Sequence, residues 1–233
     1  MERSTFEGNK LLAALPGEEL ETLGPHLEVV SLRLKEILFE QDVPIEHVYF
    51  PISCVVSLVT TMEDGQIVEV GTVGKEGMVG LPVFLGATTM PLDAFSQVPG
   101  DAVRMASKAL RTEVRPGSGL HELLGRYTEA MLVFAAQSSA CNRVHSVRQR
   151  ASRWLLHTHD RMGRDEFPLT QEFLAQMLSV RRASVNEVAR VFQGEGLIRY
   201  SRGMITVLNR PSLEAAACEC YSKIKTEFDR LPS

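Results

Sequence analysis

The stretch LTQEFLAQMLSVRRASVNEVARVFQGEG, residues 169–196, decides how this sequence folds near its C-terminus. Its first half can start a helix after the capping residue Thr170, and it places Leu174, Ala175 and Leu178 on one face. A break follows at Ser179-Val180. The second half turns Val185, Val188, Ala189 and Phe192 inward and stops at Gly194 and Gly196. The spacing therefore predicts a helix-turn-helix.

Polar side chains occupy the other face of the second predicted helix. Side chains that reach phosphates and base edges of DNA stand in its first two turns: Arg181, Arg182, Ser184 and Asn186. Backbone contacts to DNA are expected from Thr170, Gln171 and Arg190. Two amphipathic helices packed in an ordinary core would show the same apolar periodicity, so the pattern alone leaves that alternative open.

A predicted hairpin follows directly. Two short apolar runs, residues 197–200 and 204–208, flank the turn Ser201-Arg202-Gly203. A helix-turn-helix followed by a hairpin is a winged helix. Arg202 would then lie at the tip of the wing, beside the phosphate backbone.

Charge separates this region from the rest of the chain. Residues 145–212 hold eleven arginines, no lysine and six acidic residues, a net charge of +5, whereas residues 1–144 carry a net charge of −8. One basic block in an acidic chain indicates that this block meets a polyanion, and arginine suits planar contacts to phosphate and guanine. Arginines that merely decorate solvated helices are the alternative.

Composition limits the remaining classes. The chain has 233 residues, 44% of them hydrophobic, and shows neither a membrane-length apolar run nor a signal-peptide core, which predicts a cytoplasmic protein without a membrane partner. Its four cysteines are too scattered for a disulfide framework. The Cys218-Glu219-Cys220 pair could serve metal or redox chemistry, but no histidine is near it in sequence. We therefore expect it to be inert, predict no metal site, and identify no cofactor.

The N-terminal half has the pattern of an antiparallel β-roll or jelly roll. After a helical entry over residues 9–24, short apolar runs alternate with turn signals. The expected strands cover residues 28–34, 36–39, 47–51, 54–61, 67–73, 78–85, 94–98 and 101–105, with the clearest hairpin around Glu63-Asp64-Gly65.

A long helix is predicted from about residue 118 to 161. A heptad seam runs along it and predicts a dimerisation helix over 118–145, formed by Leu120, Leu124, Tyr127, Met131, Phe134, Ser138 and Cys141. A helix lying against its own β domain would give a similar stripe. The fold class is thus α+β, with a β-roll over 1–117, the dimer helix over 118–145, a winged helix over 146–212 and a helical tail over 213–233.

This order of segments, together with the helix-turn-helix sequence, resembles the Crp/Fnr family of bacterial transcription regulators. The resemblance implies a homodimer that binds double-stranded DNA at a near-palindromic site, with RNA polymerase as a further partner that the sequence leaves open. It places base reading on Arg181, Arg182, Ser184 and Asn186. The chain keeps the family's arginine at Arg182 but has Ala183 and Glu187 where the best-known members have glutamate and arginine. Ser179 replaces the usual glycine of the turn, at a modest expected cost.

The effector side departs further from the family. The corresponding pocket would involve Gly77, Gly80, Thr88 and Thr89, yet no glutamate follows Gly80 and no arginine stands between Lys75 and Arg104. A phosphodiester without an arginine partner is poorly held, so cyclic AMP binding is predicted to be weak or absent. The family's iron–sulfur branch needs an N-terminal cysteine cluster, and no cysteine precedes Cys54. A haem ligand is left open, because one histidine can suffice.

Two other classes of protein were weighed. A cupin-like metalloenzyme would need clustered histidine and glutamate ligands on the strands, but His47 is the only histidine between residues 27 and 120. We therefore predict that the chain is not an enzyme. The second rival is a ligand-sensing or interaction module whose winged helix binds protein, which DNA binding that weakens with salt would distinguish.

Overall fold

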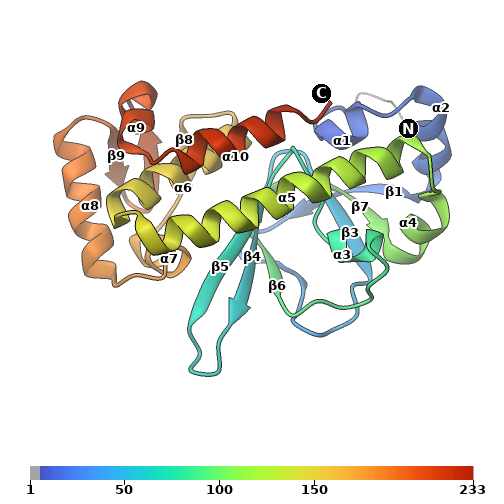
Figure 1. Cartoon of the computed structure of the whole chain (residues 1–233), viewed down its shortest axis with the longest axis horizontal. Helices are drawn as coiled ribbons and strands as arrows, with labels where there is room; N and C mark the ends of the chain where they lie inside the picture. Colours follow the sequence, from blue (N-terminus) through green and yellow to red (C-terminus); the bar gives the residue numbers. More distant parts are fainter. Residues whose placement is uncertain (1–5, 233) are drawn as a thin grey trace.

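The computed structural model describes residues 6–232 as two domains joined by helices. A β domain and a helical domain with a small sheet lie at opposite ends of α5 (Gly119–Val144), the longest helix (Figure 1). The C-terminal helix α10 (Cys220–Asp229) runs beside α5 and carries the chain back toward the β domain (Figure 1). No helix within residues 6–232 is long and apolar enough to span a membrane.

The predicted helical entry is two helices rather than one. α1 (Lys10–Ala13) and α2 (Gly17–Leu23) are separated at Pro16, whose ring removes the N–H that a continuous helix would need, and a 3₁₀ turn (Gly24–His26) follows. Asn9 caps α1 by accepting hydrogen bonds from the backbone N–H groups of Leu11 and Leu12. Its amide group also donates to the carbonyls of Pro51 and Gly77, which fixes the entry on the β domain.

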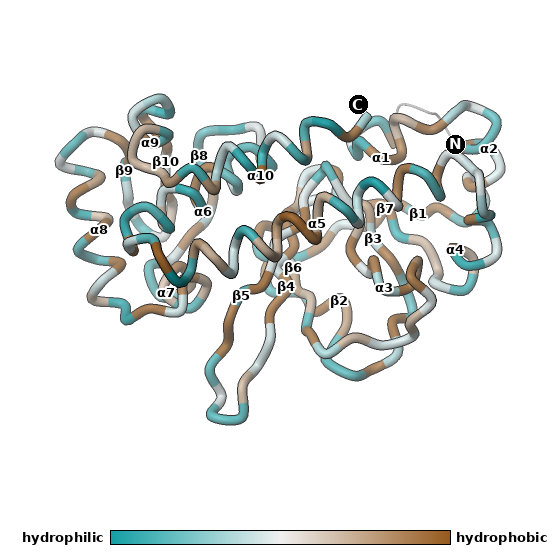
Figure 2. The backbone as a smooth tube through the Cα atoms, in the orientation of Figure 1, coloured by the Kyte–Doolittle hydropathy of each residue, from teal (hydrophilic) through white to brown (hydrophobic). Residues whose placement is uncertain are grey.

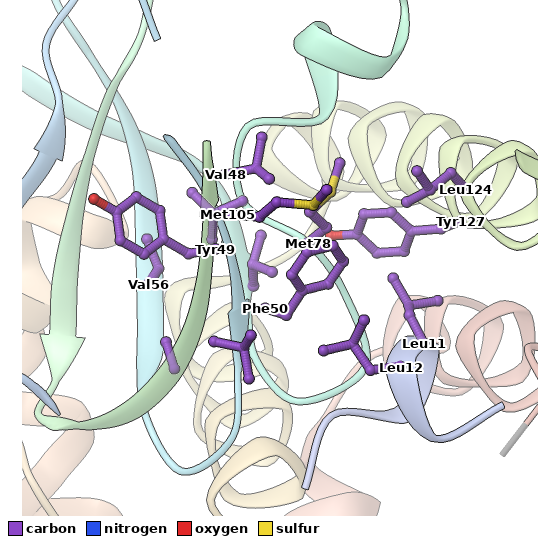
Figure 3. Close-up of a cluster of buried hydrophobic side chains, with 14 of the residues drawn as sticks. Leu11, Leu12, Val48, Tyr49, Phe50, Val56, Met78, Met105, Leu124 and Tyr127 are labelled. Carbon is purple, nitrogen blue, oxygen red and sulfur yellow. The ribbon is translucent and has the colours of Figure 1, made fainter. Parts of the chain in front are cut away.

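Two antiparallel sheets form the β domain, as the strand pattern predicted. One has the order β1-β7-β3 and the other β2-β6-β4-β5. The strands are β1 (Leu27–Leu32), β2 (Ile37–Phe39), β3 (His47–Pro51), β4 (Val55–Thr61), β5 (Ile67–Val73), β6 (Asp93–Val98) and β7 (Gly100–Ala106). The predicted hairpin is confirmed as β4–β5, which projects from the domain (Figure 1). Figure 3 shows the core, in which Phe50, Met78 and Met105 meet Leu124 and Tyr127 of α5.

The predicted strand over residues 78–85 is wrong. Val79 makes a single bridge to Tyr49, and the chain then turns into α3 (Leu81–Phe84). Gly80, with φ of +92°, and Pro82 at the start of the helix end any extended run here. A further helix, α4 (Ser107–Glu113), follows β7 and was not predicted.

The long helix predicted over 118–161 is two helices. α5 ends at Val144, His145 is extended, and α6 (Val147–Met162) begins at a capping box formed by Ser146 and Gln149. The reciprocal hydrogen bonds of a capping box satisfy free N–H groups only at a helix start. The apolar periodicity continues across this break, which is why it predicted one helix.

The heptad seam faces the chain's own core, so the prediction of a dimer seam is wrong for the residues of it that are buried there. Five are buried in the protomer, namely Leu120, Leu124, Tyr127, Phe134 and Cys141, while Met131 and Ser138 are half-buried. The apolar middle of α5 lies beside β5 (Figure 2), where a Cβ on Gly71 would lie 3.4 Å from Phe134, and Phe134 packs on Phe228 of α10. Side chains that are at most 6% exposed in the protomer offer almost no surface to a second copy, so the alternative of a helix on its own domain holds for these five residues.

The C-terminal domain is a winged helix followed by two helices. Its elements are α6, β8 (Glu166–Pro168), α7 (Gln171–Met177), α8 (Arg182–Gly194), β9 (Ile198–Ser201), β10 (Met204–Val207) and α9 (Arg210–Ala216), followed by α10. The small sheet has the order β8-β10-β9. Leu156 of α6, Phe167 of β8 and Phe192 of α8 lie in its buried core.

Polar contacts of α6 join the two domains. Arg161 of α6 donates to the carboxylate of Glu76 in the loop after β5 at 2.7 Å, and both side chains are at least nine-tenths buried. Trp154 of α6 donates its indole N–H to the carboxylate of Glu69 on β5 at 2.7 Å. Burial raises the pKa of Glu69 to about 7, against the hydrogen bonds from Trp154 and Ser57 that lower it.

Candidate nucleic-acid interface

The helix-turn-helix forms where the sequence predicted it. The hydroxyl of Thr170 accepts a hydrogen bond from the N–H of Phe173 at 3.1 Å and so starts α7. The apolar residues predicted to face inward are buried, namely Leu174, Ala175 and Leu178 in the first half and Val185, Ala189 and Phe192 of α8. Val188 is half-buried. The helix ends at Gly194, and Gly196 has the left-handed φ of +69°.

The turn between α7 and α8 is strained at Ser179. Its φ is +50°, in the left-handed region that glycine adopts at little cost. The turn is held by its own backbone, because the N–H of Ser179 donates to Gln176 and that of Val180 to Ala175. The serine therefore adopts the conformation that a glycine would adopt at this position.

The start of α8 leaves its arginines exposed. Arg181 is the residue before the helix and makes no side-chain cap, and Arg182 lies 3.9 Å from the carboxylate of Glu172 with 69% of its side chain exposed. A loose ion pair at such exposure contributes little, so the Arg182 guanidinium can leave it at small cost. Asn186 and Arg190 are also exposed, and Ser184 is half-buried.

The wing is held rigidly against the start of α7. The Tyr200 hydroxyl on β9 donates to the carbonyl of Leu169 at 2.7 Å, and the N–H of Leu169 donates to the carbonyl of Gly203 at 2.8 Å. Arg202 is exposed at the tip, where it and Gly203 have φ of +51° and +76°. This tight turn brings the wing next to exposed Thr170, whose methyl lies 3.9 Å from where a Gly203 Cβ would be.

Only some arginines of the basic block, residues 145–212, lie exposed on the protein surface. Five of its arginines are less exposed or closely paired within the chain: Arg148 with Glu195, Arg150 with the Leu178 carbonyl, Arg153 with Ser138, Arg161 with Glu76, and Arg210 with Asp160. Arg182 and Arg199 make only longer contacts, to Glu172 at 3.9 Å and to the Thr206 hydroxyl at 3.4 Å. The exposed ones are Arg164, Arg181, Arg182, Arg190, Arg199 and Arg202. The sequence analysis did not single out Arg199, which lies on β9 of the wing, or the positioning role of Tyr200. Charge counting does not separate arginines used inside the fold from those that remain free.

The structure gives packing or backbone roles to three of the four predicted effector residues. A Cβ on Gly77 would lie 2.4 Å from the Tyr127 ring, and one on Gly80 would lie 2.9 Å from Val48, so both glycines serve close packing. Thr88 is exposed and Thr89 half-buried, and the Thr88 carbonyl accepts a hydrogen bond from Ile45. Arg104, the next arginine after Lys75, pairs with Glu28 at 2.6 Å.

A histidine lies near Cys218 and Cys220 in space, although none is near them in sequence. His145 and Cys141, at the end of α5, lie beside the pair, and the four ligand atoms are within 4.8 Å of one another. Sequence reasoning missed this group because its two halves are 73 or more residues apart in the chain. The i,i+4 spacing of Cys141 and His145 on a helix was the available signal.

Two family models match the chain. Residues 29–115 match the cyclic nucleotide-binding domain, and residues 149–216 match the Crp-like helix-turn-helix domain. The chain belongs to the Crp/Fnr family. A search of curated proteins found no match.

Solved structures share the fold of this Crp/Fnr protein at low identity. FixK2 from Bradyrhizobium japonicum has 16% identity and a TM-score of 0.71 over 82% of this chain and 98% of its own. The c-di-GMP responsive global regulator CLP of Xanthomonas campestris has 15% identity and a TM-score of 0.66, over 83% of this chain and 100% of its own. A Crp/Fnr-family transcriptional regulator from Thermus thermophilus, TTHA1359, has 20% identity and a TM-score of 0.65, over 82% of this chain and 98% of its own. The antiparallel β domain, the long helix and the C-terminal helix-turn-helix are thus the architecture of Crp/Fnr-type transcription regulators.

Replacing Ser179 by glycine tests the strain in the turn. We expect Ser179→Gly to raise the free energy of unfolding by about 0.5–1 kcal/mol, because relief of the left-handed strain exceeds the added freedom of the unfolded chain. Urea unfolding followed by the fluorescence of Trp154 measures this free energy. Trp154 is the single tryptophan and lies in the C-terminal domain, which contains Ser179. Ser179→Ala is the control and should bring no gain. Equal stabilisation by alanine would contradict the backbone explanation.

Proposed function

We propose that this protein is a sequence-specific DNA-binding transcription regulator that acts as a homodimer without cyclic AMP. The observation that carries the DNA-binding part is the exposed, loosely paired set of arginines at the start of α8 and at the wing tip. Helices of this kind enter the major groove with their first turns, while wings and helix starts contact phosphates. The α8 helix of each protomer would then read one half-site.

Each candidate residue has a distinct role in this proposal. Arg181 and Arg182 read bases, with Ser184 and Asn186 beside them. Thr170, Gln171, Arg190 and Arg202 contact the phosphate backbone and set the register. Arg199 joins the second group, because it is exposed on the same wing as Arg202.

Base and phosphate contacts predict different mutant behaviour. Arg182→Ala should weaken binding to the best site by roughly 1–3 kcal/mol and relax the preference at one base pair, because a bidentate contact to guanine is lost. Arg202→Ala should weaken binding to all sequences alike and reduce the salt slope by about one unit. Selection of genomic fragments by the purified protein gives the site, and titrations at several salt concentrations give both quantities.

Arg230→Ala is a matched control for both variants. Arg230 lies at the end of α10 and pairs only with Glu227 among the described contacts of its side chain, far along the chain from the helix-turn-helix. Its loss should leave affinity and salt slope unchanged. Unchanged DNA binding in both the Arg182 and Arg202 variants would reject this interface and favour a winged helix that binds protein.

The homodimer in this proposal uses the exposed face of α5, opposite the buried seam. Leu132 and Val144 are 67% and 71% exposed, and small residues stand between and beside them at Gly125, Ala135, Ala136, Ser139 and Ala140. Apolar and small side chains along one helix face allow two helices to approach closely. A two-fold axis along α5 would set the half-sites about one helical turn of DNA apart on a near-palindrome.

Leu132→Glu tests the dimer. Glutamate keeps the helix propensity of α5 but places two charges in the proposed contact, so light scattering should show the mass falling from twice 25.8 kDa to one protomer. Leu85→Glu is the control, since Leu85 is 62% exposed and lies outside α5. A wild-type monomer at micromolar concentration, or a Leu132→Glu dimer as tight as wild type, would contradict the proposed interface.

Cyclic AMP should bind weakly or not at all. Arg104, the first arginine after Lys75, is paired with Glu28, and no arginine lies in the segment between them to meet a phosphodiester. Isothermal titration of the full chain should give no heat at low-micromolar cyclic AMP, and DNA affinity should be the same with and without it. Low-micromolar binding would overturn this part of the proposal and leave DNA recognition intact.

A further inference from the structure

A compact group of metal-ligand side chains lies at the end of α5, outside the DNA interface. Cys141 is in the last turn of α5 and His145 directly follows that helix, while Cys220 is the first residue of α10 and Cys218 lies two residues before it. The three thiols are at most 5% exposed and form a cluster of their own, and the His145 side chain is 14% exposed. All four ligand atoms lie within 4.8 Å of one another.

The distances between these atoms suit a single ion. The Sγ atoms of Cys141 and Cys218 are 3.5 Å apart, and the Sγ of Cys220 is 3.6 Å from His145 Nδ1. Zinc binds sulfur at about 2.3 Å and nitrogen at about 2.0–2.1 Å in a tetrahedron, whose edges are about 1.6 times longer, near 3.8 Å and 3.5 Å. The observed edges are close to these values, so small side-chain movements would close the group around zinc.

The surroundings of His145 orient it for such a role. Its Nε2 lies 3.3 Å from the carboxylate of Glu219, while its Nδ1 points at the Cys220 sulfur. A carboxylate on the far nitrogen of a metal-ligating histidine fixes the ring and its tautomer. Gln137 donates its amide to the Cys220 sulfur at 3.1 Å, which also favours the thiolate.

Two arginines of α6 balance the charge. Three thiolates around Zn²⁺ leave one negative charge, and Arg150 and Arg153 lie within electrostatic range of Cys141. The Nε atoms of both arginines are buried and have no hydrogen-bond partner within residues 6–232.

We propose that Cys141, His145, Cys218 and Cys220 form a structural Cys₃His site for one Zn²⁺ per protomer. Three thiolates and one imidazole are a closed ligand set, which leaves no open position for catalysis. An iron–sulfur cluster distributes its ligand sulfurs over separate iron atoms, farther apart than these, so the spacing favours a mononuclear ion. The site does not depend on the proposed DNA-binding function, because it uses none of the candidate DNA contacts.

Metal content and cobalt substitution test this site on the full chain. Protein purified without chelators and under anaerobic conditions should contain about one zinc per protomer by elemental analysis. Metal-depleted protein titrated with Co²⁺ should show tetrahedral d–d bands and thiolate-to-cobalt charge transfer that saturate at one equivalent. Cys218→Ser should lose both signals, whereas Cys54→Ser should keep them, since Cys54 is an equally buried cysteine of the β domain.

A substitution at an exposed residue tests the site even if the Cys218→Ser variant does not fold. Glu219 is 61% exposed, so Glu219→Gln should fold normally and bind zinc about 10–100-fold more weakly in competition with a chromophoric chelator. Metal well below one equivalent in wild type, equal binding in the Cys218 and Cys54 variants, or unchanged affinity in Glu219→Gln would overturn the proposal. An iron–sulfur spectrum, or a Cys141–Cys218 disulfide in the anaerobic protein, would overturn it as well.

Discussion

The buried ion pair between Arg161 and Glu76 is the contact on which the placement of the two domains depends. It joins α6 of the winged helix to the loop Gly74–Gly77 of the β domain, and both partners are almost fully enclosed. Breaking a buried pair leaves an uncompensated charge, which is strongly unfavourable, so separation of the domains here would be costly. Gly74 has no side chain and so leaves space for the Arg161 side chain in this ion pair. A Cβ at position 74 would lie 2.6 Å from the Arg161 side chain.

The same loop collects the other long-range contacts. A Cβ on Gly77 would collide with Tyr127 of α5, and the Lys75 carbonyl accepts a hydrogen bond from Lys10 at the start of α1. The Arg161 guanidinium also lies 6.0 Å from the rings of Phe134 on α5 and Phe228 on α10. Four helices and the β domain thus meet in one small region around the loop Gly74–Gly77.

Local patterns were predictable from the sequence, but which distant residues pack against or pair with one another was not. The helix-turn-helix, the wing and the β4–β5 hairpin follow from periodicity and turn residues within about 30 positions. The heptad stripe of α5 was real, but periodicity shows only that a face is buried, not whether its own domain or a second copy covers it. Likewise, composition could not tell that Arg148, Arg150 and Arg161 contact groups within the chain, and neither could it bring Cys141 near Cys218. Those facts depend on the tertiary fold.

The cysteine–histidine cluster lies where the chain passes from one domain to the other. It joins the end of α5 to the start of α10, and the capping box that starts α6 follows His145 directly. Arg150, within electrostatic range of Cys141 and Cys218, donates to the carbonyl of Leu178 immediately before the strained turn at Ser179. Arg150 thus lies between the cluster, with which it interacts through its charge, and the turn of the helix-turn-helix, to which it is hydrogen-bonded. The Arg161–Glu76 pair holds the other end of α6 on the β domain, so α6 has polar contacts near both of its ends. These contacts limit how far α6 can tilt relative to the β domain and to the turn before α8.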